Sequence, residues 1–499
     1  MKKILLCILD GMGIREEMIG NAFKNASKPN IDYFLNNYPN SLLKAAEEEV
    51  GLPKGQIGNS EVGHSNIGAG RIVYQSLLHI NNKIKDKSFF DNDKLNEVID
   101  KCKENNSKIH LMGLASDGGV HSHIDHLFTL LDLLNKKNFK NVYLHLFTDG
   151  RDTDPKSGIG FIDKVNNKLK LLEFGTIATI SGRYYAMDRD NNFDRIKLAY
   201  DAIVSGIGKE YNNYNEVFKD SYSNNITDEF IIPSVLDKNG NIEDNDGIIL
   251  FNFRKDRIVE LFSCLTNEEY NKFDVKRKNI SLVSFMNISD TVKGEYAFSL
   301  EKLNNTLGEV ISNNKLTQLR IAETEKYYHV TYFFDGCKDL ELKGCKKIMI
   351  PSPKVKTYDL KPEMSALKIT SKLLEEINNR KPDFIVMNFA NGDMVGHTGD
   401  YDAAVKAVEF VDLCLGKIYN EVKDDYTIII TADHGNCEVM INEDGSVNTA
   451  HTTSLVPFII TDKNLTLNNG KLGDIAPTIL ELLNIDKPKE MKGTSLIRK

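Results

Sequence analysis

The run Ile4-Leu5-Leu6-Cys7-Ile8-Leu9, followed at once by Asp10-Gly11, introduces the pattern on which the whole chain is built. A short apolar run that stops at a turn-forming pair is typical of a strand buried on both faces of a parallel sheet. Similar runs recur along the chain and alternate with segments of helical periodicity. We predict strands at Ile4–Leu9, Ile109–Leu114, Val142–Phe147, Thr176–Ile180, Ile248–Phe253, Ile280–Phe285, Phe384–Phe389, Thr427–Thr431 and Val456–Ile460. We predict helices at His126–Asn135, Arg195–Ser205, Ala366–Glu376 and Ala403–Tyr419, among others.

This alternation predicts an α/β fold with mainly parallel sheets that are flanked by helices. In such sheets, binding and catalytic sites form where the strands end, at the carboxyl edge. The residues that directly follow each predicted strand are therefore the first candidates for a functional site.

Length and composition limit the class of protein. The chain has 499 residues, which is too long for one ordinary core and predicts two or more domains. Hydrophobic residues make up 41% and charged residues 27%, which excludes a collagenous, coiled-coil or disordered chain. The formal net charge of −8 offers no net attraction to nucleic acid or to an anionic membrane, so we expect neither as a partner.

Cysteine usage and the first residues point to the cytoplasm. The seven cysteines are odd in number and form no Cys-x-x-Cys pair, so neither a disulfide framework nor a cysteine zinc site is indicated. The apolar run after Lys2-Lys3 stops after six residues, which is shorter than the h-region of a signal peptide. No other run approaches the length of a membrane span. We therefore expect a cytoplasmic protein.

Potential metal ligands gather next to four predicted strands. Carboxylates mixed with imidazoles suit Mn²⁺, Zn²⁺ or iron, whereas all-oxygen sites suit Mg²⁺ or Ca²⁺. With three histidines in the set, we favour Mn²⁺ or Zn²⁺. The candidates are Asp10 after the first strand, Asp393 and His397 after Phe384–Phe389, Asp433 and His434 after Thr427–Thr431, and His451 before the last strand.

Each of these residues taken alone has a simpler explanation. An Asp before Gly at a strand end is usually a turn former, and a single His is more often a core residue. Two features favour a metal site: all the candidates lie at strand ends, and Asp433-His434 places two ligands side by side where a turn needs one. Asp393 and His397 are four residues apart, so they would share a face if their segment opens a helix.

The segment Gly55–Arg71 is rich in glycine and contains Ser60. Its glycines would let backbone amides approach an anion, and Ser60 would lie near a helix N-terminus, where the dipole favours phosphate. Ser60 is equally well explained as an N-cap, with Glu61 in the first turn of the helix. A serine without a Ser-His-Asp arrangement can be activated by a metal ion, and the candidate ligands would supply that ion.

Between these two groups, strand ends carry arginine instead. The planar guanidinium binds phosphate or carboxylate through two hydrogen bonds, so these arginines favour a local trap for an anion in a net acidic protein. The alternative is surface salt bridging within the Arg–Asp clusters, which is common and weak. The five arginines are Arg151, Arg183, Arg189, Arg254 and Arg257.

These motifs together resemble the cofactor-independent phosphoglycerate mutases. The resemblance covers essentially the whole chain in order, without a departure at any position that the family uses for catalysis. It rests on Leu9-Asp10-Gly11, Gly55–Arg71, His121-Ser122-His123, Asp149–Thr153, Ser181–Tyr184 with Met187–Arg189, Asn252–Arg254 with Asp256-Arg257, Ala322–Tyr327, Asn391–His397, Ala432–Gly435 and His451–Thr453. It implies a metal-dependent interconversion of 3-phosphoglycerate and 2-phosphoglycerate, in glycolysis and gluconeogenesis, through a phosphoserine and without 2,3-bisphosphoglycerate.

The resemblance also implies a role for each matching residue. Ser60 would be the nucleophile, and two divalent ions, which we expect to be Mn²⁺, would lie beside it. Asp10, Asp433 and His434 would share the metal of Ser60, and Asp393, His397 and His451 would hold the second metal. Asp152 would be the acid and base on the glycerate hydroxyls, and Lys326 would support the leaving oxygen. The substrate would be held by His121, Arg151, Asp152, Arg183, Arg189, Arg254, Arg257 and Lys326.

The implied architecture is an alkaline-phosphatase-like domain into which a phosphotransferase domain is inserted. The order of the motifs supports this independently, because Asp10 and Ser60 precede the arginines and Asp393 to His451 follow them. One metal cluster requires both ends of the chain to meet in one domain. We predict a discontinuous metal-binding domain at residues 1–75 and 302–499 and an inserted substrate-binding domain at residues 76–301.

Two other functions remain open at this point. A phosphohydrolase or phosphopentomutase would share the metal ligands but not the arginine clamp. A non-catalytic phosphoanion-binding or structural protein would keep the scaffold alone, and the complete set of apparent ligands with Ser60 counts against it. We expect a monomer whose only partner is the small-molecule substrate.

Overall fold

The computed structural model describes residues 3–300 and 302–498 and divides the chain into two compact units. Unit 1 consists of residues 1–75 and 301–499, and unit 2 of residues 76–300. Each unit has its own eight-stranded sheet with helices on both faces, so the predicted α/β class with two mainly parallel sheets is confirmed. Within the described ranges, no helix combines the length and the apolar character that crossing a membrane requires.

The sheet of unit 1 has the strand order β12-β11-β13-β1-β14-β15-β2-β16. Every neighbouring pair is parallel except those that β15 makes, because β15 runs antiparallel to both β14 and β2. The strands are β1 Lys3–Leu9, β2 Asn40–Lys44, β11 Gln318–Glu323, β12 Cys345–Ile350, β13 Phe384–Phe389, β14 Tyr426–Thr431, β15 Val456–Ile460 and β16 Gly470–Lys471. The central position of β1 explains its composition, since residues 4–9 are buried on both faces.

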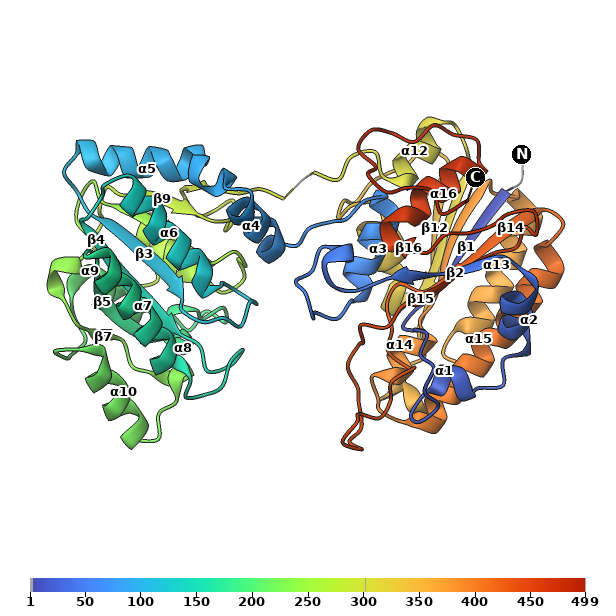
Figure 1. Ribbon diagram of the computed structural model, residues 1–499, viewed down its shortest axis with the longest axis horizontal. Coiled ribbons are helices and arrows are strands. Elements are labelled where there is room, and N and C mark those ends of the chain that lie inside the picture. The colour runs from blue at the N-terminus through green and yellow to red at the C-terminus, as the bar shows by residue number, and fades with distance from the viewer. Residues whose placement is uncertain (1–2, 301, 499) are drawn as a thin grey trace. The chain divides into compact units, whose positions relative to one another are not determined.

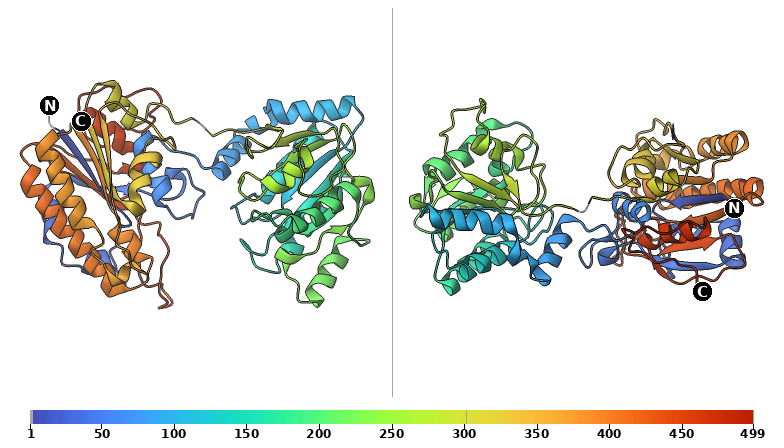
Figure 2. Two further views of the ribbon diagram at one scale, coloured as in Figure 1. Left: turned by 180° about the vertical axis from the view of Figure 1, so that it is seen from behind. Right: turned by 90° about the horizontal axis from the view of Figure 1, so that it is seen from above.

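Two groups of helices cover this sheet, one on each face (Figures 1 and 2). In one group, α15 packs against α1, α2 and α13; in the other, α3 packs against α12 and α16. The helices of unit 1 are α1 Ala22–Asn25, α2 Pro29–Asn37, α3 Ser60–Ala69, α12 Leu307–Asn313, α13 Ala366–Arg380, α14 Asn391–Gly396, α15 Tyr401–Val422 and α16 Ile475–Leu482. The long α15 contains the whole of the predicted helix Ala403–Tyr419. It buries an apolar stripe that includes Ala407, Val411 and Leu415.

The sheet of unit 2 has the order β10-β9-β8-β3-β4-β5-β7-β6, and only the pairing of β5 with β7 is antiparallel among the described strands. Its strands are β3 Ile109–Leu114, β4 Val142–Thr148, β5 Thr176–Gly182, β6 Lys209–Glu210, β7 Ser234–Val235, β8 Gly247–Leu250, β9 Ser281–Ser284 and β10 Glu295–Tyr296. Its helices are α4 Ser76–Lys85, α5 Asp93–Glu104, α6 Ile124–Lys136, α7 Gly158–Leu172, α8 Arg183–Ala186, α9 Phe193–Ser205, α10 Tyr214–Ser223 and α11 Val259–Thr266.

Unit 2 has two separate hydrophobic cores, one on each face of its sheet. The larger core joins the sheet to α5, α6, α7 and α10, through residues such as Leu95, Leu127 and Phe218. The smaller core joins it to α9 and α11, through residues such as Ile196 and Phe262. Each face of the sheet is therefore sealed within this unit.

Candidate metal centre and anion pocket

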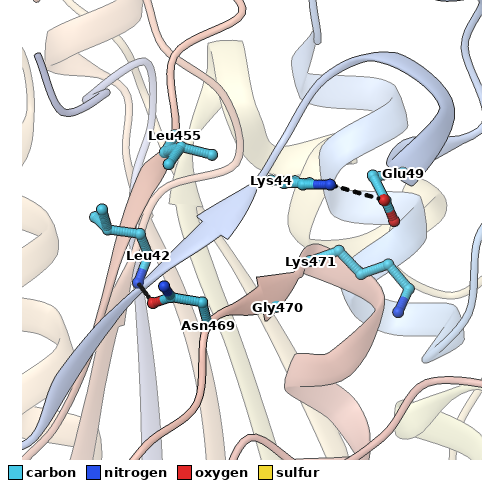
Figure 3. Close-up of a pocket in the computed structure, with 7 residues that line it drawn as sticks. All are labelled: Leu42, Lys44, Glu49, Leu455, Asn469, Gly470 and Lys471. Atoms are coloured by element: carbon cyan, nitrogen blue, oxygen red, sulfur yellow. Dashed lines mark hydrogen bonds and ion pairs between the residues drawn. The ribbon is translucent and has the colours of Figure 1, made fainter.

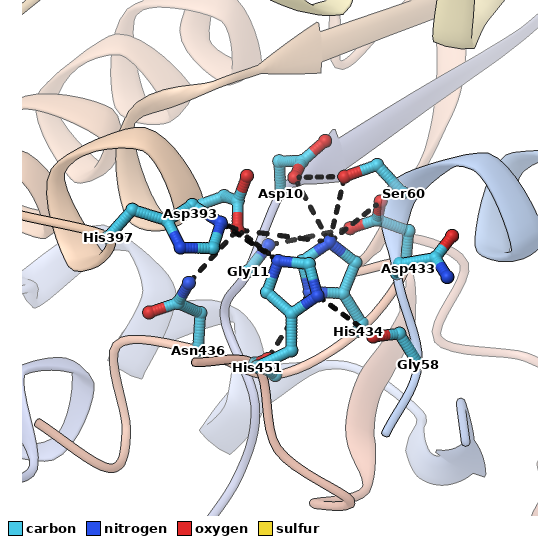
Figure 4. Close-up of polar contacts among 12 residues, drawn as sticks. Asp10, Gly11, Gly58, Ser60, Asp393, His397, Asp433, His434, Asn436 and His451 are labelled. Atoms are coloured by element: carbon cyan, nitrogen blue, oxygen red, sulfur yellow. Dashed lines mark hydrogen bonds and ion pairs between the residues drawn. The ribbon is translucent and has the colours of Figure 1, made fainter. Parts of the chain in front are cut away.

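The candidate metal ligands meet at the carboxyl edge of the unit 1 sheet (Figure 4). Asp10 directly follows β1, and Asp433 and His434 follow β14 on one side of it. On the other side, β13 leads into α14, where Asp393 and His397 are one helical turn apart. His451 comes from the loop before β15. Three adjacent parallel strands thus deliver their ligands to one place.

The ligands form two groups, each with donor atoms close enough for one ion. Asp10, Asp433 and His434 form a fully buried group, and Asp393, His397 and His451 form a group that is partly open to solvent. In each group, the possible ligand atoms lie within 4.8 Å of one another. His434 Nε2 is 4.0 Å from Asp393 Oδ1, so the two groups are neighbours.

The three histidines are held so that the same ring nitrogen faces the carboxylates. Nδ1 of His397, His434 and His451 hydrogen bonds to the carbonyl oxygen of Thr449, Gly435 and Gly58, respectively. This leaves each Nε2 free to act as a ligand, the arrangement that backbone carbonyls impose on metal-binding histidines.

Contacts between the ligand atoms also fit bound cations. His397 Nε2 and His451 Nε2 are 2.9 Å apart, and two ring nitrogens at this distance need a proton or a cation between them. His451 Nε2 is 3.0 Å and His397 Nε2 3.1 Å from Asp393 Oδ1. Asp433 Oδ2 is buried and accepts no hydrogen bond of good geometry in the described part of the chain, although His64 Nδ1 lies 3.1 Å away. The mixed oxygen and nitrogen set suits divalent ions of the Mn²⁺ and Zn²⁺ type.

Ser60 lies beside the buried group of Asp10, Asp433 and His434 (Figure 4). It is the first residue of α3, 6% exposed, and its Oγ is 3.2 Å from Asp10 Oδ1 and 2.9 Å from His434 Nε2. The explanation of Ser60 as an N-cap is wrong, because Asn59 is the N-cap and its side chain accepts a hydrogen bond from the backbone N–H of Val62. The Ser60 hydroxyl therefore faces the candidate ligands rather than capping its own helix.

Lys326 provides the positive charge of this centre. Its Nζ donates to Ser60 Oγ at 2.7 Å and lies 2.8 Å from Asp10 Oδ1 and 2.6 Å from Asp393 Oδ2. Burial alone would lower the pKa of Lys326, but the charges of Asp10 and Asp393 outweigh burial and raise it. Lys326 therefore belongs to unit 1, where it contacts Ser60 directly.

The pKa values of the candidate ligands are set by the many charged groups that are buried close together here. Burial would raise the pKa of Asp10, but Lys326 and His434 lower it overall. Burial would lower the pKa of His434, but Asp433, Asp10 and Asp393 raise it to about 10. A proton on His434 thus balances part of the negative charge of the nearby carboxylates. A divalent cation would take over that role and release the proton.

The glycines near the ligands serve close packing. Gly11 has φ +73°, and a Cβ there would lie 2.7 Å from Asp393 Cα, so only glycine lets the β1 and β13 loops meet. A Cβ on Gly63 would lie 2.6 Å from the carbonyl oxygen of Asp433. Gly63 therefore lets α3 approach the β14 loop closely, and the expectation that the glycines of Gly55–Arg71 open backbone amides to an anion stays a prediction.

The predicted substrate residues of unit 2 lie at the carboxyl ends of its strands. A pocket of about 410 Å³ is lined by Arg151, Arg183, Arg189 and Arg257. Arg195 lines it as well and was not predicted; it stacks on the Tyr184 ring, with Cζ 3.9 Å from the centroid. Arg254 and His121 do not line this pocket but meet at Asp256, which is 3.0 Å from Arg254 Nε and 3.8 Å from His121 Nδ1.

Most of these arginines are paired with carboxylates. The buried Arg183 contacts Asp149 at 2.7 Å and Asp152 at 2.5 Å. Arg189 contacts Asp256 at 3.0 Å, and Arg151 lies 3.5 Å from Glu229.

The pocket remains electropositive despite these pairs. Burial lowers the pKa of Arg257, and the positive charges of Arg189, Arg151 and Arg183 lower it further. Outside the lining of the pocket, burial and the charge of Arg183 lower the pKa of His121 to about 4. An anion is the ligand that such a pocket stabilises.

Several residues of the metal centre were not predicted from the sequence. Asn388 Nδ2 donates to Asp10 Oδ2 at 2.7 Å, Asn436 Nδ2 donates to Asp393 Oδ1 at 3.0 Å, and His64 Nδ1 is 3.1 Å from Asp433 Oδ2. The one available signal was a polar residue at position 388, inside an otherwise apolar strand.

A further pocket of about 330 Å³ lies away from this chemistry, beside β2 and β16 (Figure 3). Its two lysines are already paired: Lys44 with Glu49 at 3.0 Å and Lys471 with Asp474 at 3.1 Å. Its remaining lining is largely apolar or backbone, so it offers no reactive group.

Comparisons with known proteins agree on one family. Residues 80–290 match the family described as BPG-independent PGAM N-terminus, and residues 255–477 match type I phosphodiesterase / nucleotide pyrophosphatase. The chain is 52% identical to the 2,3-bisphosphoglycerate-independent phosphoglycerate mutase of Aster yellows witches'-broom phytoplasma and 51% identical to that of Clostridium botulinum. Each alignment covers 100% of this chain and 99% of the relative. A crystal structure of Leishmania mexicana phosphoglycerate mutase is similar with a TM-score of 0.64 at 29% identity, covering 100% of this chain and 98% of that one.

Proposed function

This chain belongs to the 2,3-bisphosphoglycerate-independent phosphoglycerate mutases, isomerases of the alkaline phosphatase superfamily, and from that premise we propose that it transfers the phosphoryl group of phosphoglycerate through Ser60 with the help of two Mn²⁺ ions. The substrates would be 3-phosphoglycerate and 2-phosphoglycerate. The observation that carries the proposal is the position of the Ser60 hydroxyl, within 3.2 Å of Asp10, His434 and Lys326, which come from three different segments.

The proposed metal ligands are the two groups described above. Asp10, Asp433 and His434 would hold one ion with Ser60, and Asp393, His397 and His451 would hold the other. When bound, such ions supply positive charge that favours the ionised serine and neutralises the transferred phosphoryl oxygens. Mn²⁺ fits the mixed carboxylate and imidazole donors.

The first half of the reaction would use the residues around Ser60. Ser60 Oγ attacks phosphorus, and the bond from phosphorus to the glycerate oxygen breaks. The Lys326 ammonium, 2.7 Å from Ser60 Oγ and fully buried, would stabilise the charge on the leaving oxygen. Its tight contacts with Asp10 and Asp393 keep it oriented for this task.

The second half requires glycerate to stay bound while it presents its other hydroxyl. Arg151, Arg183, Arg189, Arg254, Arg257 and His121 would hold its carboxylate and the phosphoryl group. Asp152, which is oriented by Arg183 at 2.5 Å, would take and return the hydroxyl protons. If glycerate escaped, water would accept the phosphoryl group from Ser60 in its place. The enzyme would then act as a phosphatase.

The phosphoserine is tested by trapping it. Ser60→Ala should keep the fold and lose mutase activity, because the covalent route disappears while the packing hardly changes. Acid quenching of the wild type during turnover, followed by peptide mass spectrometry, should find one phosphoryl group on the peptide that contains Ser60. The matched control is Ser65→Ala, which changes another buried serine of the same helix. In this variant the peptide that contains Ser60 should still carry the phosphoryl group. Phosphate on another residue, or mutase activity in Ser60→Ala, would contradict the assignment.

The metal requirement is tested on the same sample. Removal of metal with a chelator should abolish mutase activity, and Mn²⁺ should restore it with two ions bound per chain. A phosphohydrolase would release inorganic phosphate instead of the isomer, so the ratio of isomerised product to free phosphate separates the two functions.

A further inference from the structure

Glu438 is a fully buried carboxylate that touches none of the proposed metal ligands, yet it contacts three segments that carry them. Its Oε2 accepts the backbone N–H of Gly13 at 3.1 Å and of Asn436 at 2.8 Å. Its Oε1 accepts the hydroxyl of Thr452. Gly13 is three residues after Asp10, Asn436 two residues after His434, and Thr452 directly follows His451.

The backbone around Glu438 is shaped to admit its carboxylate. A Cβ on Gly13 would lie 2.5 Å from Glu438 Cδ, and a Cβ on Gly435 would lie 2.4 Å from Glu438 Oε1. Gly435 and Thr452 also pair through a backbone hydrogen bond of 3.0 Å from the Thr452 N–H. Two glycines therefore leave room for one carboxylate where the ligand loops converge.

The charge of Glu438 is not balanced by a protein cation. No lysine, arginine or histidine of the described residues forms an ion pair with it within 4.0 Å. Its hydrogen bonds come from two amides and a hydroxyl, which satisfy its oxygens but carry no net charge. A buried, unpaired negative charge is costly in the absence of a nearby cation.

We propose that Glu438 is a positioning residue for the metal centre, which clamps the loops of Asp10, His434 and His451 together and strengthens the binding of divalent cations by its buried negative charge. This inference rests on the proposed function, because it requires that the two ligand groups hold ions. The contact network also reaches Asp393, since Asn436 donates both to Glu438 through its backbone and to Asp393 through its side chain. All four ligand-bearing segments thus meet at Glu438 or at its direct partner.

The experiment compares Mn²⁺ binding in the full-length wild type and in Glu438→Gln. The amide can accept the two N–H groups through its oxygen and face the Thr452 hydroxyl with its NH₂, so the shape is kept while the charge is removed. We expect the affinity for Mn²⁺, measured by calorimetry on chelator-treated protein, to fall by about 10- to 100-fold, the usual effect of changing a residue that supports ligands. The metal-free variant should unfold at the same or a higher temperature than the metal-free wild type.

Two further variants separate the clamp from a general charge effect. Glu443→Gln, on an exposed part of the same loop, removes the same charge without the contacts and should bind Mn²⁺ like the wild type. Thr452→Val removes the hydroxyl that links Glu438 to the His451 loop, so it should weaken one of the two ions more than the other. At saturating Mn²⁺, Glu438→Gln should recover most of its kcat with an unchanged KM for 3-phosphoglycerate.

The outcomes distinguish this inference from the proposed function. If the wild type binds two Mn²⁺ ions and Glu438→Gln binds them equally well, Glu438 has no positioning role, although the proposed function stands. If metal-free Glu438→Gln is less stable than metal-free wild type and excess Mn²⁺ does not restore kcat, Glu438 is needed only for folding, and the inference is wrong. If the wild type binds no Mn²⁺, the metal part of the proposed function fails, and this inference fails with it.

Discussion

The arginines of unit 2 face carboxylates of their own unit. Asp256 lies between Arg189 and Arg254, 3.0 Å from each, and Glu229 lies 3.5 Å from Arg151. An incoming anion must compete with these partners or use the guanidinium N–H groups that they leave free. A ligand that offers both a carboxylate and a phosphoryl group can replace more of them than a simple anion can, which favours phosphoglycerate.

Arg254 provides a direct test of glycerate retention. Its side chain is half exposed, so Arg254→Ala should leave the fold intact and remove one charge-assisted contact of about 1.5–3 kcal/mol. Isomerisation should fall by roughly 10- to 100-fold, while phosphate release falls less, because glycerate escapes from the phosphorylated enzyme. Both products are measured in one assay of 2-phosphoglycerate and inorganic phosphate. Lys255→Ala, an exposed neighbouring cation, is the control, and an equal loss of both products in Arg254→Ala would exclude a retention role.

Glu323, at the end of β11, leads to a pH-dependent stability. Burial raises the pKa of its carboxyl to about 7, and this outweighs the hydrogen bonds that the carboxyl accepts from Ser352 and from the Ser365 N–H, the latter at 3.3 Å. Because the folded pKa exceeds the unfolded value of 4.5, the stabilising contribution of the protonated group is full below about pH 4.5 and is lost as the pH rises towards 7.

Glu323→Gln should therefore gain stability relative to the wild type as the pH rises from 5 to 8, by roughly 3 kcal/mol at most. Denaturant unfolding of both proteins at several pH values measures this difference. Glu325→Gln, an exposed neighbour, should show no such trend. A difference between Glu323→Gln and wild type that does not change with pH would exclude the effect.

Single residues were predictable where a turn or a strand end marks them. Asp10 and Asp433 stand directly after apolar runs, so the rule for parallel sheets was enough to select them. Glu438 and His64 were missed because their importance lies in contacts with segments hundreds of residues away, such as the Gly13 N–H for Glu438. Nothing in their local sequence distinguishes such residues from surface polar side chains.

Among the secondary-structure elements, β3, β13 and β15 have the bounds that the apolar runs predict. Their direction was not predictable: β15 is antiparallel in an otherwise parallel neighbourhood, because pairing depends on the partner and not on the run itself. β11 was missed because Gln318, Arg320 and Glu323 are polar but buried. Arg320 is accommodated by a 2.8 Å hydrogen bond to Gln318 and by stacking on Phe334, neither of which periodicity can reveal.

The strands of unit 2 share a buried chain of hydrogen-bonded polar side chains. His110 on β3 hydrogen bonds to His145 on β4 at 3.0 Å, and His145 to Thr179 on β5 at 2.9 Å. His110 also contacts Asp246 at 3.0 Å. Burial lowers the pKa of both histidines, that of His145 well below the usual value. Each histidine is therefore harder to protonate in the folded state than in the unfolded chain.

A histidine whose folded pKa is depressed stabilises the fold above its unfolded pKa of about 6.5 and loses that contribution as the pH falls below it. Unit 2 should therefore lose stability between pH 6.5 and 5. His145→Gln should reduce the slope of stability against pH by up to about 1.4 kcal/mol per pH unit, whatever its absolute stability. Hydrogen exchange of the amides of β3 and β4 at several pH values measures this slope. His123→Gln is the control variant. An unaltered slope in His145→Gln would exclude the mechanism.

The molecule as a whole divides its functional residues between two units, with the proposed nucleophile and metal ligands in unit 1 and the arginines in unit 2. Sequence reasoning reached this division from the order of the motifs, because Ser60 and Asp433 can share a metal only if distant parts of the chain meet. Boundaries are harder to predict, since a short connection has no compositional signal. In the structure the units divide after residue 75 and after residue 300.

Unit 2 should fold by itself because it contains a complete sheet and two cores of its own. A protein of residues 76–300 should show a cooperative unfolding transition and should bind 3-phosphoglycerate in the presence of a chelator, more weakly than the full chain and without turnover. Circular dichroism and calorimetry measure the two properties. Binding that requires Mn²⁺ would show that the arginines are not a self-sufficient anion site.

The place of β1 in its sheet has a consequence for biosynthesis. The strand precedes every other described element, but its neighbour β13 begins at Phe384, about 380 residues later, which the ribosome adds in roughly 20–80 s at ~5–20 residues per second. During that interval the apolar segment Ile4–Leu9 lacks both of its neighbours in the sheet, β13 and β14, whereas all of unit 2 has been synthesised once residue 300 is added. Nascent chains arrested before β13 should therefore present this segment to chaperones while unit 2 already resists protease. Chains arrested after β14 should no longer present it, because β1 then has both of its neighbours in the sheet.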